Sequence, residues 1–250
     1  MYNLHLAYSS ALMEAKAAKQ RRDPATYRTY RRAQEKISRR KILSTSSVYV
    51  PYFVLIMGLS AYYGYFLRAL LFVPVGAALW MAFEYFSHRY VLHAHFAVSH
   101  VWYKFPYTWL ANKFLDPMHF QHHERPFDGN HTSGRLRDML MLFIPFAPLS
   151  IWLFPPFTAS VVAATFFLGY IVEEWVHHTT HYYNFTNPYL RYMRKHHMYH
   201  HTKRGMKAGF GTSSGVLDYL FGTRYPEPIR EKLYGNKRKG IAAQQAEVEV

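Results

Sequence analysis

Long apolar stretches alternate with charged ones along the chain, and they predict helices that cross a membrane. Residues 48–67 contain no charged side chain, and about twenty residues are what a helix needs to cross ~30 Å of hydrocarbon. Arg68 ends this stretch, and residues 69–86 follow at once with one charge near their far end. Residues 139–156 and 157–176 form a second pair of the same kind. The pattern predicts four membrane spans arranged as two helical hairpins.

The basic residues favour one side of these predicted spans. Of the 30 Lys and Arg residues, eleven lie in residues 1–47, six in 88–138 and twelve in 177–250, which leaves only Arg68 on the other side. Cytoplasmic loops of membrane proteins are enriched in Lys and Arg. We therefore predict a multi-pass protein with both termini in the cytoplasm, in a bacterial inner membrane or the endoplasmic reticulum.

The chain divides into three predicted regions. Residues 1–47 form a basic cytoplasmic region. Its helix-prone part, residues 10–41, is interrupted at Pro24 and either lies along anionic headgroups or is a solvated helix. Residues 48–234 form the membrane domain, and residues 235–250 are predicted to be a disordered tail. The first region lacks the apolar core of a cleaved targeting peptide, so we expect none.

Composition narrows the chemistry. There is no cysteine, which excludes disulfides, thiolate metal sites and iron–sulfur clusters within the chain. The formal charge of +15 indicates an anionic neighbour, either acidic lipid or nucleic acid. The basic residues flank the predicted spans without a nucleic-acid recognition motif, so we expect a membrane and no nucleic acid as partner. Any metal must bind through nitrogen or oxygen, and the chain contains 16 histidines.

Ten of the histidines fall into four short patterns, each at the end of a predicted span or in a cytoplasmic segment. Side chains three or four residues apart lie on one face of a helix, so three of these patterns can each direct two or three imidazoles at one point. The fourth pattern is a pair five residues apart, which requires a slightly unwound turn or two different metal ions. The candidate metal ligands are His88, His93, His119, His122, His123, His177, His181, His197, His200 and His201.

Such a cluster indicates bound metal. Packing many imidazoles together costs desolvation and repulsion unless a cation holds them neutral. One ion takes roughly four to six ligands, so ten imidazoles indicate two ions. Imidazole binds iron, copper, nickel and zinc alike, which leaves the metal open. We expect the histidines outside the patterns to be structural or solvent-facing: His5, His95, His100, His131, His178 and His196.

The four histidine patterns, their order and their positions after the second and fourth predicted spans resemble the fatty acid hydroxylase/sterol desaturase superfamily of membrane non-heme di-iron enzymes. The resemblance covers about residues 80–225. Four parts of it are most similar to the fatty acid 2-hydroxylase branch: Gly169-Tyr170, the block 195–201, and the segments 209–213 and 217–223.

This resemblance implies an all-α integral membrane protein with four transmembrane helices. A cytoplasmic helical cap would hold two iron ions between the ten patterned histidines, and zinc can substitute for iron in a purified form. It also implies O2-dependent hydroxylation of a lipid acyl chain in a fatty acid or sphingolipid-type substrate. Electrons would come from an external donor of the cytochrome b5, ferredoxin or rubredoxin type with its reductase.

Three acidic residues are candidates for orienting the ligand imidazoles. Glu84 and Glu173 each precede a patterned histidine by four residues, and each either accepts a ring N–H or extends to the headgroups. Glu174 stands where the 2-hydroxylase branch has an Asp, which implies the same orienting role. The patterns identify no catalytic residue beyond the metal ligands.

Two departures from the branch affect what surrounds the site. The segment between His93 and His119 is longer than in the 2-hydroxylases, which makes it a candidate lining of the substrate path. The sequence also contains no fused cytochrome b5 domain, so we expect electrons from a separate protein.

Other functions are compatible with parts of the pattern. A sterol or carotenoid hydroxylase and a desaturase would use much the same ligands, and only product analysis separates them. A metal transporter needs polar residues at membrane depth, whereas the predicted spans have few before their cytoplasmic ends. A membrane-anchored structural zinc protein needs only about four ligands per ion. We therefore favour the oxygenase.

Overall fold

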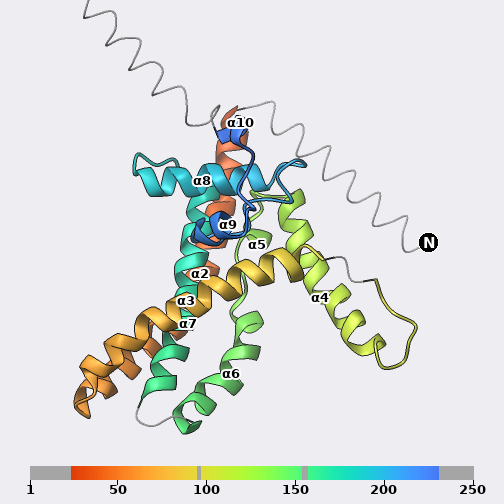
Figure 1. Cartoon of the computed structure of the whole chain (residues 1–250). Coiled ribbons are helices and arrows are strands. Elements are labelled where there is room, and N and C mark those ends of the chain that lie inside the picture. The colour runs from red at the N-terminus through yellow and green to blue at the C-terminus, as the bar shows by residue number, and fades with distance from the viewer. Residues whose placement is uncertain (1–23, 95–96, 154–156, 231–250) are drawn as a thin grey trace, which may run out of the picture.

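The computed structural model describes residues 24–94, 97–153 and 157–230 (Figure 1). Within these ranges every regular element is a helix, which confirms the all-α class. The predicted tail, residues 235–250, lies outside them. The elements are α2 (Pro24–Tyr62), α3 (Phe66–Ser87), the π-helix η1 (His88–Leu92), α4 (Phe105–Glu124), α5 (Gly129–Thr132), α6 (Leu136–Leu153), α7 (Thr158–Tyr182), α8 (Pro188–His200), α9 (Val216–Leu220) and α10 (Glu227–Arg230).

Helix α7 is central, and it packs against α2, α3, α6 and α8. Buried aromatic side chains fill the space between α2, α3 and α7: Tyr49 and Trp80 pack on Phe167 and Tyr170. The rings of Tyr49 and Phe167 stack at 5.4 Å. A Cβ atom at Gly169 would come within 2.6 Å of Trp80 Cγ, so glycine is what permits α3 to approach α7 this closely.

Three helices among the described residues are long and apolar enough to cross a membrane: α2, α3 continued by η1, and α7. They overlap the predicted spans 48–67, 69–86 and 157–176, but α2 ends at Tyr62, so the turn to α3 falls inside the first predicted span. The remaining predicted span, 139–156, corresponds to α6, which has 18 residues and two internal prolines. Positions 154–156 of this predicted span lie outside the described residues. The count of four spans therefore stays a prediction.

The long helices present apolar side chains outward, as lipid-facing helices do. Leu67 and Leu71 of α3 are 79% and 71% exposed, and Met141 of α6 is 73% exposed. A soluble protein rarely exposes extended apolar surface of this kind. The surface therefore suits a hydrocarbon environment.

The first predicted region is not separated from the first span. Helix α2 runs for 39 residues through position 47 without a break, about 58 Å at the standard rise. Pro24 is the first residue of this helix, and the residues before it lie outside the described ranges, so the interruption predicted there stays a prediction. Proline lacks an N–H, and the first turn of a helix needs none, so a helix can start at Pro24.

The two ends of the bundle differ. Helix α8 lies across one end, beside α9 and α10, and the turn between α2 and α3 lies at the other end (Figure 1). Helix α4 leaves the α8 end and diverges from the bundle. The α8 end is the helical cap, and the patterned histidines are found there.

Candidate metal centre

The ten patterned histidines converge in two groups of five, with the candidate ligand nitrogens of each group all within 4.8 Å of one another. Helices α3 with η1, α4, α7 and α8 supply them. Group A contains His88, His93, His119, His123 and His200. Group B contains His122, His177, His181, His197 and His201.

Helical geometry decides which group each histidine joins. In α4, His119 and His123 belong to group A and His122 to group B. An α-helix turns about 100° per residue, so positions four apart differ by about 40° and positions three apart by about 60° in the opposite sense. Helix α8 and its C-cap residue His201 follow the same rule, with the four-apart pair His197 and His201 in group B and His200 in group A. Each three-histidine pattern therefore contributes to both groups.

The pair His88 and His93 lies in one group because the helix widens between them. The π-helix η1 begins at His88, and the His93 N–H donates to the His88 carbonyl at 3.3 Å. In a π-helix the hydrogen bond joins residues five apart, which aligns their side chains. The unwound turn that this spacing requires is thus present.

Ring nitrogens in group A lie at hydrogen-bonding distance from one another. His93 Nε2 is 2.9 Å from both His119 Nε2 and His200 Nε2. His123 Nε2 is 3.0 Å from His119 Nε2, and the buried His88 Nε2 has no hydrogen-bond partner. A neutral imidazole carries one ring proton, so one nitrogen cannot donate to two neighbours at once. A cation would instead receive a lone pair from every ring.

Group B has the same close arrangement. His181 Nε2 lies 2.8 Å from His197 Nε2 and 3.0 Å from His177 Nε2. His177 Nε2 is in turn 2.9 Å from His122 Nε2, and His201 Nε2 is 2.9 Å from His197 Nε2. Both groups therefore fit a metal ion held only by imidazole nitrogens, a donor type that suits iron, copper, nickel and zinc.

The protonation state of the cap histidines also fits metal binding. Burial, followed by the nearby His200, lowers the pKa of His93 to about 3. Burial and His93 lower the pKa of His123 to about 4, and burial and His123 lower that of His200 to about 3. Burial and neighbouring imidazoles also lower the pKa of His122, well below its ordinary value. Neutral rings at physiological pH have lone pairs free for a metal.

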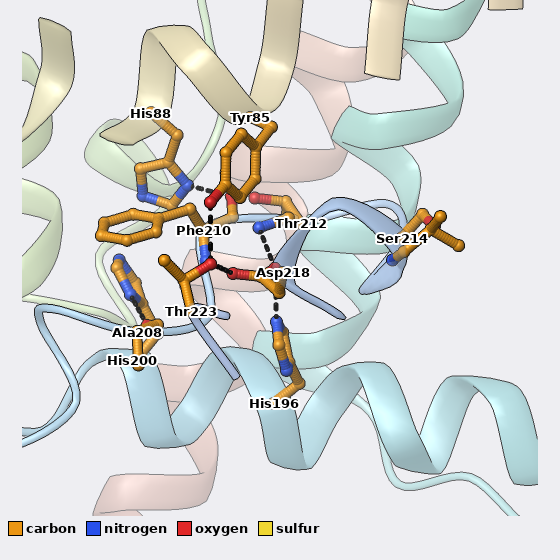
Figure 2. A network of polar contacts seen from close by, with 12 residues as sticks. Tyr85, His88, His196, His200, Ala208, Phe210, Thr212, Ser214, Asp218 and Thr223 are labelled. Carbon is orange, nitrogen blue, oxygen red and sulfur yellow. Dashed lines mark hydrogen bonds and ion pairs between the residues drawn. The ribbon is translucent and has the colours of Figure 1, made fainter. Parts of the chain in front are cut away.

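Two histidines of group A are also fixed by backbone carbonyls of the loop that follows α8. His88 Nδ1 donates to the Phe210 carbonyl at 2.5 Å, and His200 Nδ1 donates to the Ala208 carbonyl at 2.7 Å (Figure 2). A carbonyl oxygen can only accept, so each Nδ1 carries the proton and each Nε2 is left with its lone pair. The loop therefore selects the tautomer in which Nε2 faces the group.

Asp218, which the sequence patterns did not single out, holds this loop. Its carboxylate is fully buried and accepts the N–H of Phe210 at 2.9 Å and of Gly211 at 2.8 Å. It also accepts the Thr223 hydroxyl at 2.6 Å and lies 3.2 Å from His196 Nε2. Burial raises the pKa of Asp218, but the His196 contact and the other hydrogen bonds outweigh it and leave the pKa below its usual value. An ionised Asp218 is therefore the state that the structure favours.

Glu84 acts on the same loop and not directly on a histidine. Sequence spacing made it a candidate acceptor for His88, but the Phe210 carbonyl takes that N–H. The Glu84 carboxylate instead accepts the backbone N–H groups of Thr212 and Ser213, the latter at 2.8 Å, and the Ser213 hydroxyl. These buried donors would otherwise lack an acceptor, which explains where the carboxylate points.

Glu174, another acidic candidate, accepts a backbone N–H and not an imidazole N–H. Both oxygens of Glu174 accept the Gly134 N–H, at 3.1 and 3.2 Å. Among the described contacts, neither Glu173 nor Glu174 accepts a hydrogen bond from a histidine. Their orienting role stays a prediction.

Histidines outside the four patterns have various environments. His178 is buried and its Nδ1 lies 2.7 Å from Ser38 Oγ, while His196 contacts Asp218. His131 lies 3.9 Å from Asp128, and His100 is exposed. None of these four belongs to a metal-ligand group among the described residues. His5 and His95 lie outside those residues.

Known proteins share the segment that holds these groups. Residues 73–223 match the family model described as Fatty acid hydroxylase. Fatty acid 2-hydroxylase of Rattus norvegicus is 29% identical over 177 residues, which cover 64% of this chain and 41% of the relative. Dihydroceramide fatty acyl 2-hydroxylase FAH2 of Arabidopsis thaliana is 26% identical over 178 residues, or 71% of this chain and 70% of the relative.

A solved structure is similar as well. Full-length scs7p, in which only the hydroxylase domain is visible, superposes with a TM-score of 0.61 at 25% identity, covering 74% of this chain and 67% of that one. The chain spans about two fifths of the length of the rat relative. Relatives named as 2-hydroxylases and the scs7p structure support the 2-hydroxylase branch. Since the family model covers more than half of the residues, the chain belongs to the fatty acid hydroxylase family.

Proposed function

We propose that this chain hydroxylates the acyl chain of a membrane lipid, using dioxygen and two iron ions held by groups A and B. The observation that carries the proposal is that ten imidazoles converge into two groups of five. Relatives named fatty acid 2-hydroxylase and dihydroceramide fatty acyl 2-hydroxylase support a fatty acid or a ceramide-type acyl chain as substrate.

The imidazoles would hold one ion in each group. When bound, the iron pair supplies dioxygen activation and the oxidation of an unactivated C–H bond, which protein side chains cannot perform alone. The reaction consumes one dioxygen, two electrons and two protons per C–H bond and yields an alcohol and water. The electrons would come from a donor of the cytochrome b5, ferredoxin or rubredoxin type with its reductase.

The chain's own residues position the ligands and exclude water. The Phe210 ring is buried and lies 5.5 Å from the His93 ring and 5.6 Å from the His200 ring, so it covers group A with an apolar surface. Phe127 lies 6.0 Å from the ring of His181 in group B. A low-polarity surrounding protects a reactive centre from solvent, and the apolar helices beside it favour approach of a lipid.

Two other functions fit the structure less well. A structural zinc ion takes four ligands, whereas five imidazoles converge in each group. A transporter needs polar residues along its spans. The groups instead gather where η1, α4, the end of α7 and α8 meet, in the cap.

Expression in a lipid-producing host, followed by mass spectrometry of its lipids, tests the proposal. The natural chain should add one oxygen to an acyl chain, and His200→Ala should abolish that product. His100→Ala is the matched control, because His100 is exposed and outside both groups, and it should retain the product. Loss of two hydrogens would identify a desaturase instead. Identical lipids from all strains would refute both activities.

A further inference from the structure

The two histidine groups differ in what lies behind their rings. In group A, the Nδ1 atoms of His88 and His200 donate to carbonyls. In group B, four of the five Nδ1 atoms are buried without a hydrogen-bond partner among the described residues, those of His122, His181, His197 and His201, whereas in group A this holds for His123. Among the described contacts, a supporting polar network therefore reaches rings of group A and not those of group B.

That network ends in two carboxylates, which accept hydrogen bonds from consecutive backbone N–H groups. The N–H groups of Phe210 and Gly211 point to Asp218, and those of Thr212 and Ser213 point to Glu84. Four successive N–H groups of one loop therefore donate to these two carboxylates. With its N–H groups fixed on one side, the backbone turns the Phe210 carbonyl toward His88 on the other (Figure 2).

The loop depends on these acceptors because its backbone conformation is unusual. Gly209 has a φ of +74°, and a Cβ atom at Gly211 would lie 1.9 Å from the Ser214 carbonyl oxygen. The Gly209 N–H donates to the Thr223 carbonyl at 2.8 Å, and the Thr223 hydroxyl donates to Asp218. Asp218 therefore joins both ends of the loop. Residues 209–214 form neither helix nor strand, so no regular hydrogen-bond pattern stabilises them.

We propose that Asp218 and Glu84 are positioning residues for the group A metal, and we call this pair of carboxylates the clamp. They fix the loop carbonyls that orient His88 and His200, and so set the affinity of group A without touching its ion. Hydrogen bonds behind ligating imidazoles typically change metal affinity by about 10- to 100-fold. Group B is independent of this clamp. The inference rests on the proposed role of the two groups as metal sites.

Metal stoichiometry of the full chain tests the inference without any turnover. The purified protein in detergent is loaded anaerobically with iron(II), passed through a mild chelator resin and analysed for iron per chain. The natural chain should retain about two equivalents and Asp218→Asn about one, in line with the weakening above. Asn has the same size as Asp, but its NH2 group faces the backbone donors. Glu84→Gln should change retention in the same direction.

Asp138→Asn is the control. The Asp138 carboxylate also accepts a backbone N–H, that of Arg135 at 3.1 Å, but it lies at the start of α6, which carries no patterned histidine. This variant should retain both ions. Thermal unfolding and gel filtration check that each variant is folded. If Asp218→Asn does not fold, Thr223→Val removes one hydrogen bond to the same carboxylate and should give the same selective loss.

Double variants assign the lost ion to a group. His200→Ala removes a ligand of group A and His177→Ala one of group B. Asp218→Asn should add little to the loss caused by His200→Ala, whereas combined with His177→Ala it should leave almost no iron. Non-additivity of this kind identifies residues that act on one site. A merely destabilising substitution would weaken both groups equally.

Three results would contradict the proposals in different ways. If folded Asp218→Asn and Glu84→Gln retain both ions at natural affinity, the clamp has no role and the proposed function is untouched. If Asp218→Asn empties both groups equally, the selectivity is wrong. If the natural chain retains no iron, the proposed function itself fails.

Discussion

Groups A and B contain the same number of imidazoles but hold them by different means. Group B takes two pairs of histidines, four residues apart, from α7 and α8, so regular helices aim the rings. Group A combines one such pair in α4 with a π-turn and with a loop whose carbonyls orient two rings. Regular helices therefore suffice to aim the paired rings of group B. Group A also needs carboxylates that are far away in sequence.

The largest expected effect is the loss of lipid hydroxylation when either group loses a ligand, because we expect the reaction to need both groups. His177→Ala in group B and His200→Ala in group A should each lower lipid hydroxylation by more than about 100-fold, since losing a ligand exceeds the effect of losing its hydrogen-bond support. Mass spectrometry of host lipids measures the product, and iron analysis should show one ion left in each variant. Substantial product from either variant would mean that a single group supports the reaction.

Acid should affect the two groups alike, because burial and neighbouring imidazoles lower histidine pKa values in both. In group A the pKa of His93 and of His200 is lowered to about 3, and in group B the pKa of His197 and of His201 is lowered well below the ordinary value. Unfolded histidines titrate near pH 6.5, so between about pH 6.5 and pH 3 the unfolded chain binds more protons than the folded one. Stability of the metal-free chain is therefore full above this window and falls as pH drops through it.

Thermal unfolding of the metal-free chain at pH 7.5 and pH 5.5 measures this effect. We expect Tm to fall by at least about 5 °C, since roughly 2–4 °C corresponds to each kcal/mol in a chain of this size. Replacing one histidine by Ala in either group should reduce the difference between the two pH values similarly. A reduction confined to one group would show that groups A and B differ in acid sensitivity, and not only in the hydrogen-bond support behind their rings.

Local features of this chain were predictable from its sequence, and long-range ones were not. The apolar runs located the three long helices, because span length is a local property. Five-residue spacing between His88 and His93 left two alternatives, an unwound turn or two different metal ions, and the structure contains the unwound turn. The interruption predicted at Pro24 stays a prediction, because the residues before it lie outside the described ranges. Helix α2 continues from the first span back to Pro24, further than the span pattern indicated.

The clamp behind group A had no signal that spacing could find. Asp218 and Glu84 are far apart in sequence, and they meet only through the backbone of the loop. The oxygens that receive the ring N–H groups belong to Ala208 and Phe210, whose side-chain identities say nothing about a carbonyl. Assignment of each histidine to group A or B likewise depended on how α4 and α8 are rotated in the folded protein. Only the three-dimensional structure supplies that rotation.

Chelation kinetics should separate the groups by a smaller factor. Pre-oriented ligands hold an ion more tightly, so the group A ion should leave about ten times more slowly than the group B ion. The iron-loaded chain is mixed with a strong chelator, and release is followed by absorbance. Two phases are expected in the natural chain, and Asp218→Asn should remove the slow one. A single phase in the natural chain would argue that the bracing gives no kinetic advantage.

The smallest expected effect comes from two glycines that share a backbone conformation and differ in place. Gly209 has a φ of +74° in the loop behind group A, and Gly64 has a φ of +79° in the turn between α2 and α3, at the other end of the bundle. Alanine in the left-handed region costs about 1–2 kcal/mol wherever it occurs, so both Gly209→Ala and Gly64→Ala should lower stability by similar amounts. Only Gly209→Ala should also weaken iron retention, by a few-fold and in group A alone, because it displaces the carbonyls beside it. Equal iron retention in the two variants, at equal loss of stability, would mean that the loop's conformation does not reach the metal.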